Sequence, residues 1–170
     1  MSRSIRIMTG CLVAVAFSAL AVTLTADGGT RTVQVRDDCD PATFNAAVGD
    51  GTCIGGGDTA FGDFIAELQA TQSAEKWSFK PSSTDDTRLV ARNRGGEVHT
   101  FTPVVQFGGG VVDILNQLSN NPVVAPECAN PATFGASVVP PGGTSKEIKA
   151  NPGDHFQCCI HPWMRLTVAK

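Results

Sequence analysis

Hydrophobic and polar residues alternate along much of the second half of the chain, a pattern that predicts β-strands. Residues 76–81 (KWSFKP) and 87–93 (TRLVARN) alternate, and residues 99–107 (HTFTPVVQF) are rich in β-branched and aromatic side chains. Residues 136–159 follow the order strand, turn, strand, turn, strand, with two Pro/Gly turn clusters about ten residues apart. This spacing favours an all-β fold, a β-sandwich, over residues 75–170.

A helical period precedes these strands. Over residues 58–70 (DTAFGDFIAELQA) apolar side chains recur at positions i, i+3, i+4 and i+7, and Asp58 or Thr59 can cap the first turn. These apolar residues are Phe61, Phe64, Ile65 and Leu68. We interpret the stripe as a packing surface. The sequence therefore predicts an N-terminal extension, residues 27–74, that contains one short helix.

A second irregular segment interrupts the predicted strands. Residues 107–135 contain three consecutive glycines, a short helical pattern over 112–118 and Cys128, and they are expected to form an inserted connection. The hexapeptide CDPATF (39–44) is echoed by CANPATF (128–134). One short echo with unequal spacing does not indicate a repeat architecture.

The first residues have the composition of a secretory signal peptide. Arg3 and Arg6 precede an apolar run over residues 11–22, and small residues follow it. The run is shorter than the roughly 20 residues that span a bilayer. We therefore expect residues 1–26 to be removed on export, leaving a periplasmic or extracellular chain with no membrane span.

The charge of the chain is mildly acidic. The sequence has 13 Lys and Arg against 16 Asp and Glu, and loss of Arg3 and Arg6 moves the formal charge to 11 − 16 = −5. Nucleic acid is not an expected partner, because no basic stripe is present to neutralise phosphates. The acidic pairs at residues 37–38 and 85–86 are interpreted as solvated turns.

The cysteine count carries more information than the charge. Apart from Cys11 in the leader, five cysteines remain, and an oxidising compartment pairs spare thiols. An odd number leaves one sulfur unpaired whichever disulfides form. Cys39 and Cys53 can close a loop of about 15 residues, a size expected to contribute about 3 kcal/mol. The spacing alone leaves several pairings of the five open.

One window near the C-terminus has the residues of a metal site. Cys158-x-x-His161-x-x-Met164 offers a thiolate, an imidazole and a thioether from a single loop, and His99 follows a Gly-Gly turn at the start of another strand. A thiolate, two imidazoles and a weak axial thioether form the site that binds copper for electron transfer. Zinc usually takes four strong ligands and rarely methionine. His155 shares no loop spacing with Cys158 and is expected to be an ordinary strand residue.

Two stretches, NRGGEVHTFTPV and PGDHFQCCIHPWMRLTV, resemble the cupredoxins, the blue copper proteins, and the second has an amicyanin-like short ligand loop. The resemblance covers roughly residues 75–170 and implies a Greek-key β-sandwich with one type 1 copper ion. It implies His99, Cys158, His161 and Met164 as the copper ligands.

Further expectations follow from this resemblance. If Cys158 binds copper, its neighbour Cys159 faces the other side of the strand and is free to pair with Cys128, beside a Cys39–Cys53 bridge. Many relatives carry Asn after the first histidine ligand, and the hydroxyl of Thr100 in this chain can make one similar bond between the two ligand loops.

The implied function is one-electron transfer with a redox partner protein of unknown identity. Electrons are expected to pass at the ring edge of His161, which reaches the surface in the family. Pro162 and Trp163 then form an apolar docking patch, or Trp163 packs against the loop; the sequence does not choose between these roles.

Other readings of the same residues are weaker. Cys158 and Cys159 can form a vicinal disulfide or act as ordinary structural cysteines, and a dinuclear copper site needs cysteines further apart. A copper-delivery protein usually has methionine-rich or histidine-rich tracts, which this chain lacks. A structural domain that only keeps the fold is the other alternative. An enzyme is not expected, because four protein ligands leave copper no open position and no other catalytic motif is present.

Overall fold

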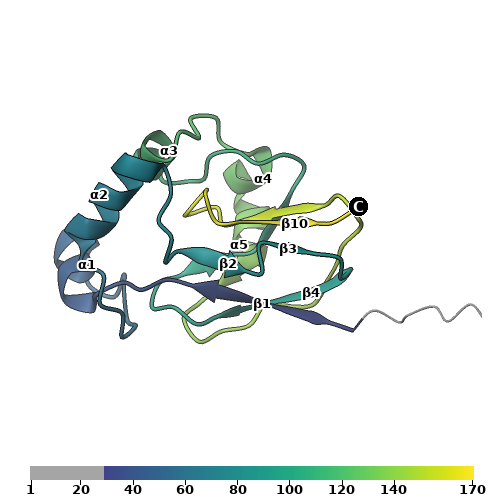
Figure 1. Cartoon of the computed structure of the whole chain (residues 1–170), viewed down its shortest axis with the longest axis horizontal. Coiled ribbons are helices and arrows are strands. Elements are labelled where there is room, and N and C mark those ends of the chain that lie inside the picture. The colour runs from purple at the N-terminus through teal and green to yellow at the C-terminus, as the bar shows by residue number, and fades with distance from the viewer. Residues whose placement is uncertain (1–28) are drawn as a thin grey trace, which may run out of the picture.

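The computed structural model describes residues 29–170, and the predicted signal peptide, residues 1–26, lies outside them (Figure 1). The described chain is mainly β, with several short helices. The strands are β1 (Arg31–Arg36), β2 (Ser78–Lys80), β3 (Ser83–Thr84), β4 (Arg88–Asn93), β5 (His99–Thr100), β6 (Thr102–Val104), β7 (Val138–Val139), β8 (Ile148–Lys149), β9 (His155–Gln157) and β10 (Arg165–Val168). The helices are α1 (Pro41–Val48), α2 (Phe61–Thr71), α3 (Asp113–Leu118), α4 (Pro126–Ala129) and α5 (Pro131–Ser137).

The strands form mixed sheets. One sheet has the order β2-β1-β4-β8, with β1 parallel to β4 and antiparallel to β2. Another has the order β3-β10-β9-β6, and β5 pairs with β7. Within residues 29–170 no helix is long and apolar enough to cross a bilayer.

A shared hydrophobic core joins the two larger sheets. Alternation buries Val33 and Val35 of β1 on one side and leaves Gln34 between them facing outward. Phe101 stacks on Phe156 with 4.6 Å between the ring centroids and meets Phe79 edge to face at 5.4 Å. The aromatic contacts therefore run from β2 of one sheet to β9 of the other.

The segment before residue 75 contributes more than one helix. Its strand β1 lies between β2 and β4 in one sheet. The predicted boundary at residue 75 therefore places β1 outside the domain to whose sheet it belongs. Helix α2 occurs where the apolar period predicts it, but its N-cap is Ala60 and no side chain caps it. The predicted caps are engaged elsewhere: Asp58 pairs with Lys76, and the Thr59 hydroxyl donates to Asp38.

The two echoed stretches, residues 39–44 and 128–134, begin two short helices that the hydrophobic pattern does not reveal. Asp40 caps α1 and Asn130 caps α5, each accepting from two backbone N–H groups, and a proline follows each cap. A cysteine precedes each cap by one or two residues. The similar stretches therefore share one structural role, because each starts a helix next to a disulfide-bonded cysteine.

The segment 107–135 is divided between the main core, which Leu115 of α3 joins, and a small second cluster. It contains α3, close to the predicted 112–118, together with α4 and most of α5. Cys128 is buried there with Val104 and Ala125, against Cys159. Figure 1 shows α1 and α2 at one end of the strands, the end toward which the loop before β10 points.

Candidate metal centre

Three side chains from two distant segments meet in the core. His99 lies on β5, Cys158 directly follows β9, and His161 lies in the loop that leads to β10. His99 Nδ1 and His161 Nδ1 are 3.2 Å apart, and the Cys158 sulfur lies 3.7 Å from the first and 3.8 Å from the second. All three residues are buried. They form a closed triangle of two nitrogens and one sulfur.

The size of this triangle suits a single metal ion. Donors bound to one ion at about 2.0–2.3 Å, with angles between tetrahedral and trigonal, lie about 3.3–3.8 Å from one another. The observed separations of 3.2 to 3.8 Å fall close to this range. Among the described residues these three side chains form one of two groups that could hold a metal ion. The other group, Asp37, Glu97 and His99, shares His99 with the triangle.

Main-chain hydrogen bonds close the ligand loop. The Cys158 N–H donates to the Met164 carbonyl at 3.0 Å, and the Met164 N–H donates to the His161 carbonyl at 2.9 Å. Met164 itself is buried in the main core. The triangle does not include its sulfur, so the axial role of Met164 stays a prediction.

The two adjacent cysteines have different roles. Cys159 is disulfide-bonded to Cys128 and Cys39 to Cys53, which confirms both pairings, and among residues 29–170 only Cys158 is free. Burial alone would raise the pKa of Cys158, but the imidazoles of His161 and His99 outweigh it and hold the pKa well below its usual value. The lowered pKa favours the thiolate, the form that binds metals.

Thr100 ties the two ligand segments together as the sequence suggests. The Cys159 N–H donates to the Thr100 hydroxyl at 2.7 Å, and the Thr100 N–H donates to the Cys158 sulfur at 3.4 Å. Both bonds are buried, so each is protected from exchange with water. The position of Cys158 relative to His99 is thereby fixed at the backbone.

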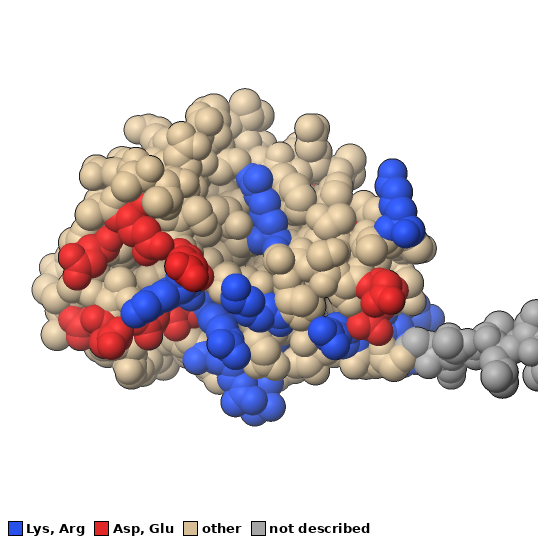
Figure 2. Space-filling view, in the orientation of Figure 1, with Lys and Arg blue, Asp and Glu red and all other residues tan. Residues whose placement is uncertain are grey.

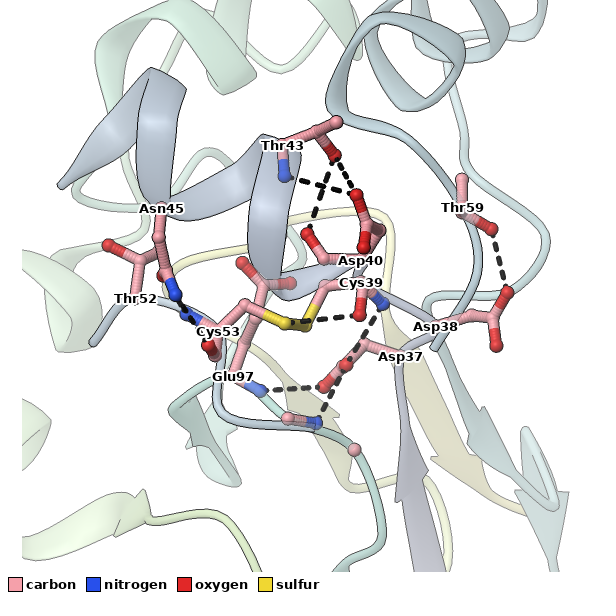
Figure 3. The surroundings of a disulfide bond; sticks show 12 residues. Asp37, Asp38, Cys39, Asp40, Thr43, Asn45, Thr52, Cys53, Thr59 and Glu97 are labelled. Atoms are coloured by element: carbon pink, nitrogen blue, oxygen red, sulfur yellow. Dashed lines mark hydrogen bonds between the residues drawn. A yellow bond between two sulfur atoms is a disulfide. The ribbon is translucent and has the colours of Figure 1, made fainter. Parts of the chain in front are cut away.

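Asp37 is the residue that sequence reasoning missed. Its carboxylate, interpreted as part of a solvated turn, has a side chain only 1% exposed and lies 2.8 Å from His99 Nε2. It also accepts from the N–H groups of Gly96 and Glu97 at 2.8 and 3.1 Å (Figure 3). A carboxylate on the second ring nitrogen fixes the tautomer and orientation of a ligating histidine.

The protonation of this pair follows from the same contacts. Burial would raise the pKa of Asp37, but the His99 ring and the two amides outweigh it, and the pKa lies below its ordinary value. Burial would likewise lower the pKa of His99, whereas its bonds to Asp37 and Cys158 raise that pKa to about 9. Asp37 is therefore an anion that holds a proton at His99 Nε2. At neutral pH the metal-free His99 also carries a proton on Nδ1, and a metal ion would take the place of that proton.

Glu97 is a second buried carboxylate behind the site. It accepts from Trp77 Nε1 at 2.5 Å and lies 3.7 Å from His161 Nε2. His161 is only 3% exposed. Glu97 and the ring of Trp163 lie beside it, and Phe64 packs on Trp163. The expectation that the His161 ring edge reaches the surface is therefore wrong for this chain.

The remaining predicted residues lie around the loop. Trp163 is half-buried, with its ring 6.0 Å from Phe64 and 5.4 Å from His161, and Pro162 is buried. The docking role of these two residues stays a prediction. His155 lies on β9 against the ring of Phe107, away from the triangle, as an ordinary strand residue does.

Two glycines explain how Asp37 reaches the site. A side chain at Gly95 would collide with the Asp37 carboxylate, and one at Gly96 would collide with the backbone of Gly55. The Gly-Gly pair before the histidine was visible in the sequence as a turn. Nothing in the local pattern indicates that the turn receives a carboxylate from a strand about 60 residues earlier in the chain.

A search with protein-family models finds no match to this chain, and a comparison with curated proteins finds no relative. The interpretation of the site therefore depends on its own geometry. Two disulfides fit an oxidising, exported compartment.

Proposed function

We propose that the chain is a mononuclear copper protein that transfers single electrons. The observation that carries this proposal is the buried triangle of His99, Cys158 and His161, with donor separations suited to one ion. Bound copper supplies a one-electron couple between Cu(I) and Cu(II). The protein holds the donors in place and keeps water away from them.

The donor set favours copper over zinc. A thiolate with two imidazoles in a plane is the arrangement found in copper electron-transfer sites, which add only a weak fourth ligand such as the predicted Met164. Structural zinc sites are usually completed by a fourth strong donor, His, Cys or carboxylate. Among residues 29–170, the group of possible metal ligands that includes the Cys158 sulfur has three members, Cys158, His99 and His161.

Burial favours electron transfer over copper delivery. A carrier must release its ion to an acceptor, which needs ligands that a partner can reach. Here His99 and Cys158 are fully buried and His161 nearly so. The Thr100 N–H donates to the Cys158 sulfur, and the Asp37 carboxylate accepts from His99 Nε2, so both ligands are held by residues outside the triangle. A rigid, closed site keeps the structural change on electron transfer small, as one-electron function requires.

The proposal extends to the fold and the place of action. The sheet order and the shared core support a cupredoxin-like, Greek-key β-sandwich, into which the segment 107–135 is inserted. The two disulfides support export by the predicted signal peptide to the periplasm or the outside of the cell. The partner is then another exported redox protein, and no enzymatic activity is proposed.

Repeated redox cycling in the presence of a copper chelator tests this function against delivery. The copper-loaded protein is reduced with ascorbate and reoxidised with ferricyanide over several cycles beside excess bathocuproine, and Cys158→Ser serves as the control. We expect the wild type to keep its copper through every cycle and the variant to lose it. Transfer of the wild-type copper to the chelator in the first reduced state would support delivery instead.

A further inference from the structure

The solvent face of the first sheet carries a row of cations. In the strand register Lys80 and Arg92 lie on either side of Gln34, and Arg36 lies one step further along β1. The strands β1, β2 and β4 contain no acidic residue. Figure 2 shows Lys and Arg gathered over these strands, whereas one group of Asp and Glu lies toward α1 and α2 and a smaller group lies at the opposite end.

A groove of about 850 Å³ lies along this face, lined by Arg36, Lys80 and Arg94 among others. All three are exposed, and within the described residues none of them is in an ion pair. Arg94 only donates to the uncharged Gln34, at 3.1 Å. The remaining lysine of the groove, Lys76, forms ion pairs with Asp38 and Asp58. These three cations therefore remain available to a ligand.

This face has the opposite sign to the molecule around it. Residues 29–170 contain 11 basic and 15 acidic residues, a formal charge of 11 − 15 = −4. The groove is lined by four cations and three acids, a formal charge of 4 − 3 = +1. Asp38 pairs with Lys76, Asp37 pairs with His99, and Glu75 is the acid in no ion pair among the described residues. The groove is therefore a local reversal of charge. A patch of this kind steers an anionic partner and loses strength as salt is added.

The groove also adjoins the candidate metal centre. Asp37 directly follows the last residue of β1, Arg36, and is among the residues that line the groove. Its carboxylate lies 2.8 Å from His99 Nε2. The other imidazole, His161, is covered by Glu97 and the aromatic residues next to α2. The Asp37 carboxylate is itself buried, so the path from the groove to a ligand runs through the covalent bonds of Asp37 and one hydrogen bond to His99. A partner at His161 would instead meet a covered ring.

We propose that the groove between Arg36, Lys80 and Arg94 docks the acidic surface of a protein redox partner, with Asp37 and His99 as the connection to the metal. This inference rests on the proposed electron-transfer function. One electron passes between the one-electron centre of the partner and the copper, with no bond made or broken. The interface is electrostatic, and it lies on the sheet face rather than at the His161 edge.

The first test maps anion binding without using copper. Hexacyanochromate(III) is an inert, paramagnetic, trivalent anion that broadens NMR signals of nearby nuclei. We expect selective broadening of the amides around Arg36, Lys80 and Arg94 at low ionic strength, lost in 0.5 M salt. Broadening centred on the Pro162–Trp163 loop, or none at all, would overturn the proposal even if the protein binds copper.

The second test measures the electron-transfer rate. Ferricyanide takes one electron from the Cu(I) protein, giving ferrocyanide and the Cu(II) protein. We expect the double variant Arg36→Gln/Lys80→Gln to react about three- to tenfold more slowly than wild type at low salt. The control Lys146→Gln/Lys170→Gln has the same net charge and should retain the wild-type rate. Equal slowing in both variants would mean that net charge, not this face, controls the rate.

The two tests separate the two proposals. A protein that binds no copper but still shows the anion map would refute the electron-transfer function and leave the cationic surface established. Cosedimentation with phosphatidylserine vesicles at the same ionic strength would instead assign the groove to a membrane surface and overturn the protein partner.

Discussion

At the scale of single residues, Asp37 connects the N-terminal strand to the candidate metal centre. Its carboxylate accepts from the amides of Gly96 and Glu97 and from the ring of His99. The same two carboxylate oxygens therefore hold the Gly95-Gly96 turn before His99 and orient the His99 ring. Its neighbour Asp38 pairs with Lys76 at the surface and makes no such contact.

Replacing Asp37 by Asn should weaken metal binding. The substitution keeps the size of the side chain but removes the negative charge beside His99, and loss of such a partner typically reduces metal affinity about 10- to 100-fold. Competition for Cu(II) against a chelator of known affinity measures the change. Asp38→Asn is the matched control and should bind copper as wild type does. Equal affinities for the two variants would show that the Asp37–His99 contact does not support the site.

Gly95 should tolerate no side chain. A Cβ at this position would collide with the Asp37 carboxylate, so Gly95→Ala must displace either the turn or Asp37. Overpacking of this kind costs about 1–3 kcal/mol, which urea unfolding of the metal-free protein can measure. Gly56→Ala is the control, because open space surrounds that position. Unchanged stability in both variants would contradict the tight fit of the turn.

The sequence predicts the candidate ligands better than the residues that hold those ligands in place. Cys158 and His161 share a loop, so their spacing is visible along the chain. Asp37 and Glu97 act across the fold, and an acidic residue in a turn looks the same in a sequence whether solvent or a histidine receives it. Only the pairing of β1 with β4 brings Asp37 to the Gly-Gly turn.

At the scale of elements, the short helices were the least predictable. α1 and α5 have seven or eight residues each and bury few side chains, so they show little apolar period. Their starts, Asp40-Pro and Asn130-Pro, are nevertheless good capping sequences. The longer α2 has the stronger apolar stripe and was found, because Phe64 and Leu68 pack into the core.

The Cys39–Cys53 disulfide should stabilise the segment that carries α1. The bridge closes a loop of 14 residues in sequence separation, for which chain entropy predicts about 3 kcal/mol. The double variant Cys39→Ala/Cys53→Ala should therefore unfold at lower urea concentration than wild type. It should still bind copper, because neither cysteine belongs to the triangle. Loss of copper binding without loss of stability would contradict this division of roles.

At the scale of the whole molecule, the N-terminal segment covers one side of the site. Phe44 and Phe64 of α1 and α2 pack on Trp77, whose indole N–H donates to Glu97 behind His161. The sequence could not predict this cover, because it depends on contacts between residues far apart in the chain. Because His161 is covered and the sheet face is cationic, we expect the partner to dock at the groove and not at the His161 ring edge.

Copper should stabilise the folded protein as a whole. The donors come together only in the folded chain, so binding adds its free energy to folding, about 2.7 kcal/mol when free copper is 100 times its dissociation constant. Thermal unfolding of the wild type should shift upward with one equivalent of Cu(I) under anaerobic conditions. Cys158→Ser should show little shift. A similar shift in both proteins would mean that copper binds somewhere else.

The most direct test of the copper site is the visible absorption spectrum with one equivalent of Cu(II). Wild type is compared with Cys158→Ser and with Cys128→Ser/Cys159→Ser, which removes the neighbouring disulfide without leaving a free thiol. We predict an intense thiolate-to-copper band that survives in the double variant and disappears in Cys158→Ser. A folded wild-type protein without this band, or a band that depends on Cys159 instead, would contradict the proposed centre.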